Sequence, residues 1–418
     1  MNIILKSAKV IDATSAFNNK TVDLLIENGI IKSIADKIET PAGFQELSFD
    51  DLHLSQGWID SSVCLGEPGY EDRETIAHGL QVAAKSGFTQ VAVEPNNHPL
   101  TDNQSIVSFI KQKAFGATTQ VFPIGALTVK SEGNDLAELY DMKNAGAVAF
   151  GDYKKSIDNA NVLKIALQYV QDFDGLVIAF SQDKSIKGKG VANEGIEATK
   201  LGLKGIPALA EDLQVARNLF LLEYTGGKMH IPTISTAASV DLIRQAKQKG
   251  LNVTCSVTVH HLTMTDEVLN DFDTRHKVLP PLRDEANRQA LINGVIDGTI
   301  DCITSEHNPL DIEHKKLEFD QATFGTIGLE SAFGALATVL PLEVIIDKLT
   351  KAREILNIET TSIAEGNKAN ITLFSPKNEW VFKKNNILSK SKNSAFLNHK
   401  MKGRVYGTLN GDKATINE

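Results

Sequence analysis

Trp58-Ile59-Asp60-Ser61-Ser62-Val63-Cys64 is a short apolar run that turns polar at its end, and Thr75–Ser86 follows it with the spacing of an amphipathic helix. Helical stretches of this kind recur at Ser105–Ala114, Leu136–Ala145 and Ala237–Lys247. Between the helical stretches lie seven further apolar runs: Gln90–Glu94, Val121–Leu127, Ala147–Gly151, Leu176–Ser181, Lys228–Ile234, Val253–Val259 and Ile300–Ser305. Strands that alternate with helices form parallel βαβ units. Eight such units predict an α/β fold, a closed (β/α)8 barrel with its chemistry at the carboxyl ends of the strands.

The two ends of the chain have a different, β-rich texture. Ile3–Leu5, Val22–Ile26 and Gly29–Ile34 have strand-like content near the N-terminus, and Ala369–Phe374 and Gly403–Leu409 have it near the C-terminus. Because a few isolated strands rarely fold alone, we expect both ends to pair in one small domain. The predicted organisation is a composite β domain from residues 1–54 and 363–418, with the barrel at 55–362.

Composition narrows the class of protein. Of the 418 residues, 42% are hydrophobic and 23% are charged, as in soluble globular proteins. The net charge is -9 without a basic block, which disfavours nucleic acid and anionic membranes as partners. Cys64, Cys255 and Cys302 are too far apart for a CxxC site or a disulfide framework. Since we find no signal peptide and no membrane-length apolar stretch, we expect a cytoplasmic protein.

Polar motifs follow the predicted strands in an informative order. They are Gly66-Glu67-Pro68-Gly69, Pro95-Asn96, Asn193-Glu194-Gly195, Ile234-Ser235-Thr236, His260-His261-Leu262, Pro280-Pro281-Leu282-Arg283, Gly328-Leu329-Glu330 and Ser389-Lys390-Ser391-Lys392-Asn393. Together they resemble a cyclic amidohydrolase, most closely a dihydroorotase of the long bacterial type, over nearly the whole chain. The resemblance implies a TIM-type, amidohydrolase-like barrel with a small β domain.

The resemblance also implies zinc chemistry, in which bound metal acidifies a water that attacks a cyclic amide. The family pattern has two histidines after strand one, a carboxylate or modified lysine after strand four, histidines after strands five and six, and an aspartate after strand eight. This chain retains only the strand-four carboxylate, as Asp152. The other vestigial positions hold Ser62, Cys64, Phe180, Thr233 and Glu306. We therefore expect no tightly bound metal, and Glu306 is the one candidate catalytic residue.

The substrate-binding positions implied by the resemblance have changed as well. Gly66 stands where the family has an arginine for the substrate carboxylate, and Leu310 stands where it has a histidine. Leu279 replaces an asparagine, whereas Asn96 is retained as a candidate substrate-binding residue. Asn96 could equally fix its own loop through the side-chain amide.

Each surviving polar residue also has a structural interpretation. Cys64 is suited to packing in the barrel interior, and Asp152 to capping backbone N–H groups. We interpret His260 and His261 as structural hydrogen-bonding residues. A competing interpretation has Cys64, Asp152 and Glu306 holding one zinc ion.

The leading hypothesis is a degenerate dihydroorotase homologue, linked to de novo pyrimidine biosynthesis, that has lost its metal and its hydrolytic activity. The resemblance suggests a homodimer and a structural or partner-binding role, for example with aspartate carbamoyltransferase. Two other functions stay open. One is an active dihydroorotase, or a related cyclic-amide hydrolase, with an altered zinc site. The other is a protein that binds a pyrimidine intermediate.

Overall fold

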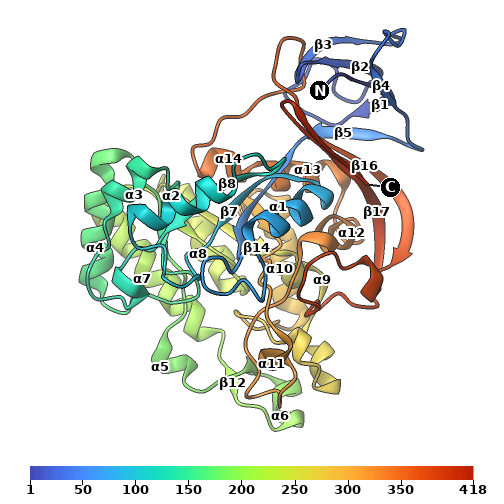
Figure 1. Ribbon diagram of the computed structural model, residues 1–418. Helices are drawn as coiled ribbons and strands as arrows, with labels where there is room; N and C mark the ends of the chain where they lie inside the picture. Colours follow the sequence, from blue (N-terminus) through green and yellow to red (C-terminus); the bar gives the residue numbers. More distant parts are fainter. Residues whose placement is uncertain (418) are drawn as a thin grey trace.

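The computed structural model describes residues 1–417, which form a barrel and an adjoining β-sheet (Figure 1). The barrel sheet has eight parallel strands in the order β15-β14-β13-β10-β9-β8-β7-β6. A parallel bridge between Val63 and His307 joins the two ends of this order and closes the barrel. The predicted (β/α)8 fold is confirmed.

Each of the eight predicted runs contains or overlaps a barrel strand. The strands are β6 (Trp58–Val63), β7 (Phe88–Val93), β8 (Gln120–Gly125), β9 (Ala149–Gly151), β10 (Val177–Ile178), β13 (Met229–Ile231), β14 (Val253–Thr258) and β15 (Cys302–Thr304). Several are shorter than their apolar runs, because the chain leaves the hydrogen-bonded ladder while its residues remain buried. Phe180 and Ile234, for example, are buried beyond the last paired residues of β10 and β13.

Helices connect the barrel strands and cover the outside of the barrel. The α-helices are α1 (Ile76–Lys85), α2 (Gln104–Lys113), α3 (Leu139–Ala145), α4 (Ala160–Tyr169), α5 (Lys184–Lys187), α6 (Ile196–Leu201), α7 (Leu209–Thr225), α8 (Ala237–Gln248), α9 (Val259–Thr263), α10 (Glu285–Ile296), α11 (Ile312–Lys315), α12 (Ala332–Leu336), α13 (Leu342–Thr350) and α14 (Ala352–Ile355). A small parallel pair, β11 (Ala192–Asn193) and β12 (Gly205–Ile206), extends from the loop after β10. The four helices named from the sequence correspond to α1, α2, α3 and α8.

Strands from both ends of the chain share the second sheet. It contains β1 (Ile3–Val10), β2 (Thr21–Glu27), β3 (Ile30–Ala35), β4 (Gln45–Leu47), β5 (His53–Gln56), β16 (Asn370–Val381), β17 (Lys400–Asn410) and β18 (Lys413–Ile416). The antiparallel pairing of β5 with β16 joins the N-terminal and C-terminal strands. Its own apolar core includes Leu5, Leu24 and Leu373. We call this sheet the β domain.

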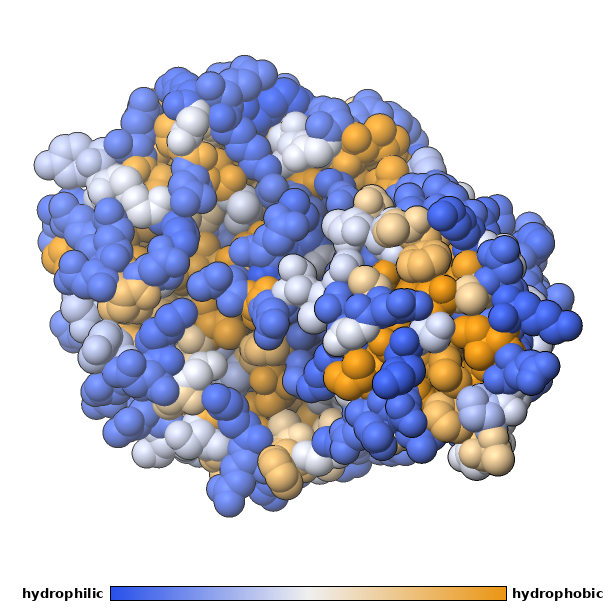
Figure 2. All heavy atoms as spheres, turned by 90° about the horizontal axis from the view of Figure 1, so that it is seen from above, coloured by the Kyte–Doolittle hydropathy of each residue, from blue (hydrophilic) through white to orange (hydrophobic). Residues whose placement is uncertain are grey.

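The face seen in Figure 2 is mostly polar. Figure 2, which views the molecule from above, shows hydrophilic residues over most of this face, with hydrophobic residues gathered most densely on the right, over the β domain. Within residues 1–417, no helix combines the length and the apolar character needed to cross a bilayer. The chain buries its apolar residues mainly around the barrel, where the largest core cluster lies.

Candidate active site at the barrel mouth

An ammonium group lies among the positions where the family pattern places metal ligands. Lys154, in the loop after β9, has its Nζ 2.9 Å from Glu306 Oε1 and 3.4 Å from Thr233 Oγ1. The same nitrogen donates to the carbonyl of Leu279 at 2.5 Å and lies 5.4 Å from the ring centre of Phe180. Three of the six vestigial positions therefore surround the Lys154 ammonium, which already has three oxygen partners.

Tyr153 links Glu306 to the residues after the first strand. Its hydroxyl donates to Glu306 Oε1 at 2.9 Å and hydrogen-bonds with the Cys64 thiol. Burial raises the pKa of the Cys64 thiol well above its ordinary value, and nearby Glu94 and Glu306 raise it further. Burial also raises the pKa of Tyr153. Cys64 is thus held as a neutral thiol rather than as a nucleophilic thiolate.

Glu94, which follows β7, is a second buried carboxyl group near this cluster. Burial raises its pKa to about 8, the charge of Glu306 adds to the shift, and a hydrogen bond from Ser62 opposes it. Its Oε2 has no hydrogen-bond partner within residues 1–417. At neutral pH this carboxyl group is therefore mostly protonated, so it is not a carboxylate ligand.

Asp152 points to the neighbouring loop instead. Its Oδ1 accepts the backbone N–H groups of Leu127 and Thr128 at 2.9 and 3.0 Å, and its Oδ2 accepts the Thr128 hydroxyl. These bonds hold the loop after β8 against the end of β9. Asp152 thus performs the backbone-capping role that was its structural interpretation.

The side chains at the barrel mouth do not fit a zinc ion. Among residues 1–417, no three His, Cys, Asp or Glu side chains converge in a way that could hold a metal. Cys64 is a neutral thiol, Asp152 is directed to backbone amides, and Glu306 is paired with an ammonium group. Zinc needs several deprotonated N, S or O donors converging on one point. The donor set of this chain does not provide them.

A cavity of about 660 Å³ opens above the cluster. Asn96, the retained candidate, lines it together with Tyr153, Lys154 and Glu306. A volume of this size is typical of small-molecule sites. Its charged lining residues are predominantly basic: Arg73, Lys154, Lys187, Lys189 and Lys277, against Glu306 and Asp320.

Within residues 1–417, Arg73 and Lys154 form ion pairs with acids, whereas Lys187, Lys189 and Lys277 form none. Arg73 Nε lies 3.1 Å from Asp311, and Lys154 is paired with Glu306. Lys277 donates to the carbonyls of Phe319 and Asp320 at 2.6 and 3.0 Å. The cavity therefore carries excess positive charge in a chain whose net charge is -9.

A side chain at Gly66, where the family has an arginine, would clash with the backbone of this chain. Its φ is +70°, and a Cβ built on it would lie 2.5 Å from the carbonyl oxygen of Tyr70 and 2.9 Å from that of Glu74. Both contacts are to backbone, which does not move aside easily. Leu310, at the position of the family's histidine, is buried on the same cavity.

The histidines after β14 differ in their environments. His261 Nδ1 bonds with the Thr258 hydroxyl at 2.7 Å, and its Nε2 with the Pro281 carbonyl at 3.2 Å, which is a structural role. His260 is fully buried, and neither ring nitrogen has a partner within residues 1–417. Burial lowers its pKa well below the ordinary value, so it is a neutral imidazole.

The whole chain resembles known dihydroorotases. Residues 53–239 match the family model "Dihydro-orotase-like". A curated dihydroorotase of Geotalea daltonii is 39% identical over 416 residues, which is 98% of each chain. That of Pelotomaculum thermopropionicum is 39% identical over 425 residues, covering 100% of this chain and 99% of the relative. The chain belongs to the dihydroorotase family.

Solved structures of other cyclic amidohydrolases share the fold. The L-hydantoinase of Arthrobacter aurescens aligns with a TM-score of 0.86 at 19% identity, covering 100% of this chain and 96% of its own. The D-hydantoinase of a Thermus species aligns with a TM-score of 0.83 at 20% identity, covering 99% and 95%. The expectations of a dihydroorotase homologue and of a barrel with a β domain are confirmed.

Two of the family motifs hold loops in this dihydroorotase homologue. Arg283 of the double-proline motif is buried, and its Nη1 donates to Asn193 Oδ1 at 2.9 Å and to the Ile206 carbonyl at 2.7 Å. Glu330 accepts the N–H and hydroxyl of Ser389 at 2.9 and 2.6 Å. These contacts preserve the shape of the barrel mouth independently of any metal.

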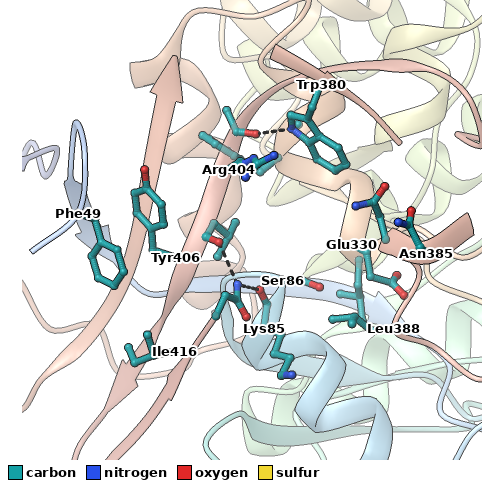
Figure 3. Close-up of a pocket in the computed structure, with 17 residues that line it drawn as sticks. Phe49, Lys85, Ser86, Glu330, Trp380, Asn385, Leu388, Arg404, Tyr406 and Ile416 are labelled. Carbon is teal, nitrogen blue, oxygen red and sulfur yellow. Dashed lines mark hydrogen bonds between the residues drawn. The ribbon is translucent and has the colours of Figure 1, made fainter. Parts of the chain in front are cut away.

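A second cavity, of about 600 Å³, lies between the β domain and α1, away from the strand ends (Figure 3). Figure 3 shows Trp380 and Tyr406 on the β domain side and Lys85 and Ser86 at the end of α1. Trp380 Nε1 donates to the Gly403 carbonyl at 2.8 Å. We interpret this cavity as a gap between the β domain and the barrel. The cluster of buried ionisable side chains lies at the barrel mouth instead.

Proposed function

We propose that this chain is a dihydroorotase homologue that does not open dihydroorotate and serves pyrimidine biosynthesis through a structural or partner-binding role. The observation that carries the proposal is the Lys154 ammonium, bound to Glu306, Thr233 and the Leu279 carbonyl at the family's metal position. A cation of the chain itself neutralises the buried carboxylate there. The same ammonium would repel an incoming metal cation.

The states of the remaining polar residues support the absence of hydrolysis. Opening a cyclic amide needs an activated water and a base that takes its proton. Glu306 is engaged by Lys154 and Tyr153, and Glu94 is protonated below a pKa of about 8. Hydrolysis with zinc on Cys64, Asp152 and Glu306 is disfavoured, because Asp152 is directed to Leu127 and Thr128.

Activity and metal content test the proposal together. Protein purified without chelator should contain far less than one zinc per chain. With or without added zinc, we expect neither opening of dihydroorotate nor cyclisation of carbamoyl-aspartate. The Geotalea daltonii dihydroorotase, assayed in parallel, is the positive control. Turnover on the order of 1 per second or above would overturn the proposal.

For the partner-binding role, aspartate carbamoyltransferase is the proposed second partner. The proposal rests on family membership and on a barrel whose mouth is kept in shape without a metal. Affinity purification of the chain from its native cell, followed by mass spectrometry, should recover the transferase. The tag expressed alone in the same cells is the control for non-specific recovery. Failure to recover the transferase would remove this partner.

Ligand binding in the mouth cavity is a second candidate function, favoured by its excess of lysines. An anionic pyrimidine intermediate would meet Lys187, Lys189 and Lys277, with Asn96 available for hydrogen bonds. Thermal shift with dihydroorotate, orotate and carbamoyl-aspartate tests it. A ligand at about a hundred times its dissociation constant stabilises by roughly 2.7 kcal/mol. Asn96→Ala should reduce the shift, and Lys384→Gln, in the exposed turn after β16 and outside the cavity lining, should not. No shift with any of the three would remove this candidate.

A further inference from the structure

The outer face of α7 exposes large apolar side chains along its whole length. Leu209, Leu213, Phe220 and Tyr224 follow one another at intervals of four, seven and four residues, which places them on one side of the helix. Phe220 is 71% exposed and Tyr224 77%. A contiguous apolar patch, rather than a single exposed residue, is the feature that marks an interaction surface.

The neighbouring helix α4 extends the apolar surface. Ile165 and Tyr169, four residues apart, are 44% and 41% exposed. Bonds at both ends hold the two helices side by side: Arg217 Nη1 donates to the Asp158 carbonyl at 2.9 Å, and Gln171 Nε2 to the Thr225 carbonyl at 3.2 Å. Figure 1 shows α4 and α7 together on the left of the barrel. We call the six apolar residues of the two helices the α4–α7 face.

Arg217 lies on this side of α7, between Leu213 and Phe220, and its guanidinium turns to the carbonyls of Ile157 and Asp158. The other charged side chains of α7 also bond within the same chain: Glu211 to Ser235, Asp212 to Ser239 and Glu223 to Lys249. An apolar surface whose neighbouring charges are already bonded within the chain can pack against a second copy of itself. A two-fold interface requires this self-complementarity.

The area of the face suits a stable dimer. With roughly 200 Å² for each fully exposed large apolar side chain, the six residues present about 700 Å². A standard interface buries about 800 Å² on each partner, and the largest apolar patch of a typical monomer covers about 300–600 Å². The face therefore supplies most of an interface of ordinary size before any polar rim is counted.

We propose that the α4–α7 face binds the same face of a second copy of this chain, forming a two-fold symmetric dimer. The inference deepens the partner-binding role proposed above by assigning a surface and an occupant to it. It does not depend on whether the barrel mouth hydrolyses anything. A dimer that forms in an enzymatically active preparation would overturn only the proposed function, and an inactive monomer only this inference.

Analytical ultracentrifugation of the pure full-length chain over a hundredfold range of concentration tests the proposal. We expect twice the chain mass of 45.4 kDa for the natural sequence. The double variant Phe220→Ser/Tyr224→Ser should sediment at the single-chain mass over the same range. Phe115→Ser, which removes a 93% exposed phenylalanine outside the face, should remain dimeric.

A further variant within the face, Leu213→Lys, places a positive charge on both copies of the face. Like the double variant, it should dissociate the dimer. Circular dichroism establishes that each variant is folded. A natural chain that is monomeric throughout, or a dimer that survives both variants, would overturn the inference. If the natural chain is monomeric and the double variant instead loses co-sedimentation with aspartate carbamoyltransferase, the face belongs to the transferase.

Discussion

Lys154 Nζ lies 2.9 Å from Glu306 Oε1, and the Glu306 side chain is only 2% exposed. A buried carboxylate without a compensating cation is costly, because few solvent dipoles remain to stabilise its charge. The Lys154 side chain is 17% exposed, so the pair lies at the edge of the mouth cavity rather than in free solvent. The lysine therefore contributes to stability at a place where the family's chemistry would use a metal.

Replacing Lys154 with methionine should destabilise the protein markedly. Removing one partner of a buried ion pair costs about 3–5 kcal/mol, because the other charge stays buried. Urea unfolding followed by circular dichroism measures the loss. In the double variant Lys154→Met/Glu306→Gln the uncompensated charge is gone, so most of the loss should be recovered. Equal destabilisation in the single and double variants would show that the ion pair is not the cause.

Restoring only the histidine pair after strand one, by Ser62→His with Cys64→His, should not restore hydrolysis. Metal ligands act as a set, and Lys154, Phe180 and Thr233 would still occupy the remaining positions. Dihydroorotate assays and zinc analysis of the same preparation measure the outcome. Stoichiometric zinc together with turnover on the order of 1 per second would mean that the other residues of the barrel mouth already support metal binding and hydrolysis.

Gly66→Ala should destabilise the protein more than Gly133→Ala. Both glycines have a positive φ, +70° and +75°, so the backbone strain of the substitution is similar. Only at Gly66 would the new Cβ meet backbone atoms, 2.5 Å from the Tyr70 carbonyl oxygen, whereas Gly133 has open space. Overpacking of this kind costs about 1–3 kcal/mol. Thermal unfolding compares the two variants, and equal stability would show that the loop at Gly66 adapts. Gly66→Arg should therefore disturb the loop before it restores any carboxylate binding.

The barrel could be predicted from the sequence because its signal is local. Runs such as Trp58–Cys64 and Val253–Val259 alternate with helical stretches, and the structure has β6 and β14 there. The pairing of the two chain ends also followed from their β-rich texture, since neither end has enough strands to form a stable sheet alone.

The side chains that meet at the barrel mouth were harder to predict. The family pattern drew attention to Asp152, whereas the next two residues, Tyr153 and Lys154, reach Glu306. Which of three successive polar residues points inward depends on the path of the loop after β9, which hydrophobic periodicity does not encode. Glu94 was also missed as a member of the cluster. Its place directly after a fully buried strand was the available signal.

Glu94 should make the stability of the protein depend on pH in a characteristic direction. Its pKa is raised from 4.5 to about 8, so between these values the unfolded chain releases a proton that the folded chain retains. Stability from this group is fully present below pH 4.5 and is lost as the pH rises to about 8, by at most about 1.4 kcal/mol per pH unit. Glu94→Gln cannot titrate, so its stability relative to the natural chain should increase steadily from pH 5 to pH 8. Urea unfolding at several pH values measures this difference, with Glu313→Gln, at an exposed position of α11, as the matched control. A difference between the natural chain and Glu94→Gln that stays constant across this range would show that the Glu94 carboxyl group ionises in the folded protein as freely as in the unfolded one.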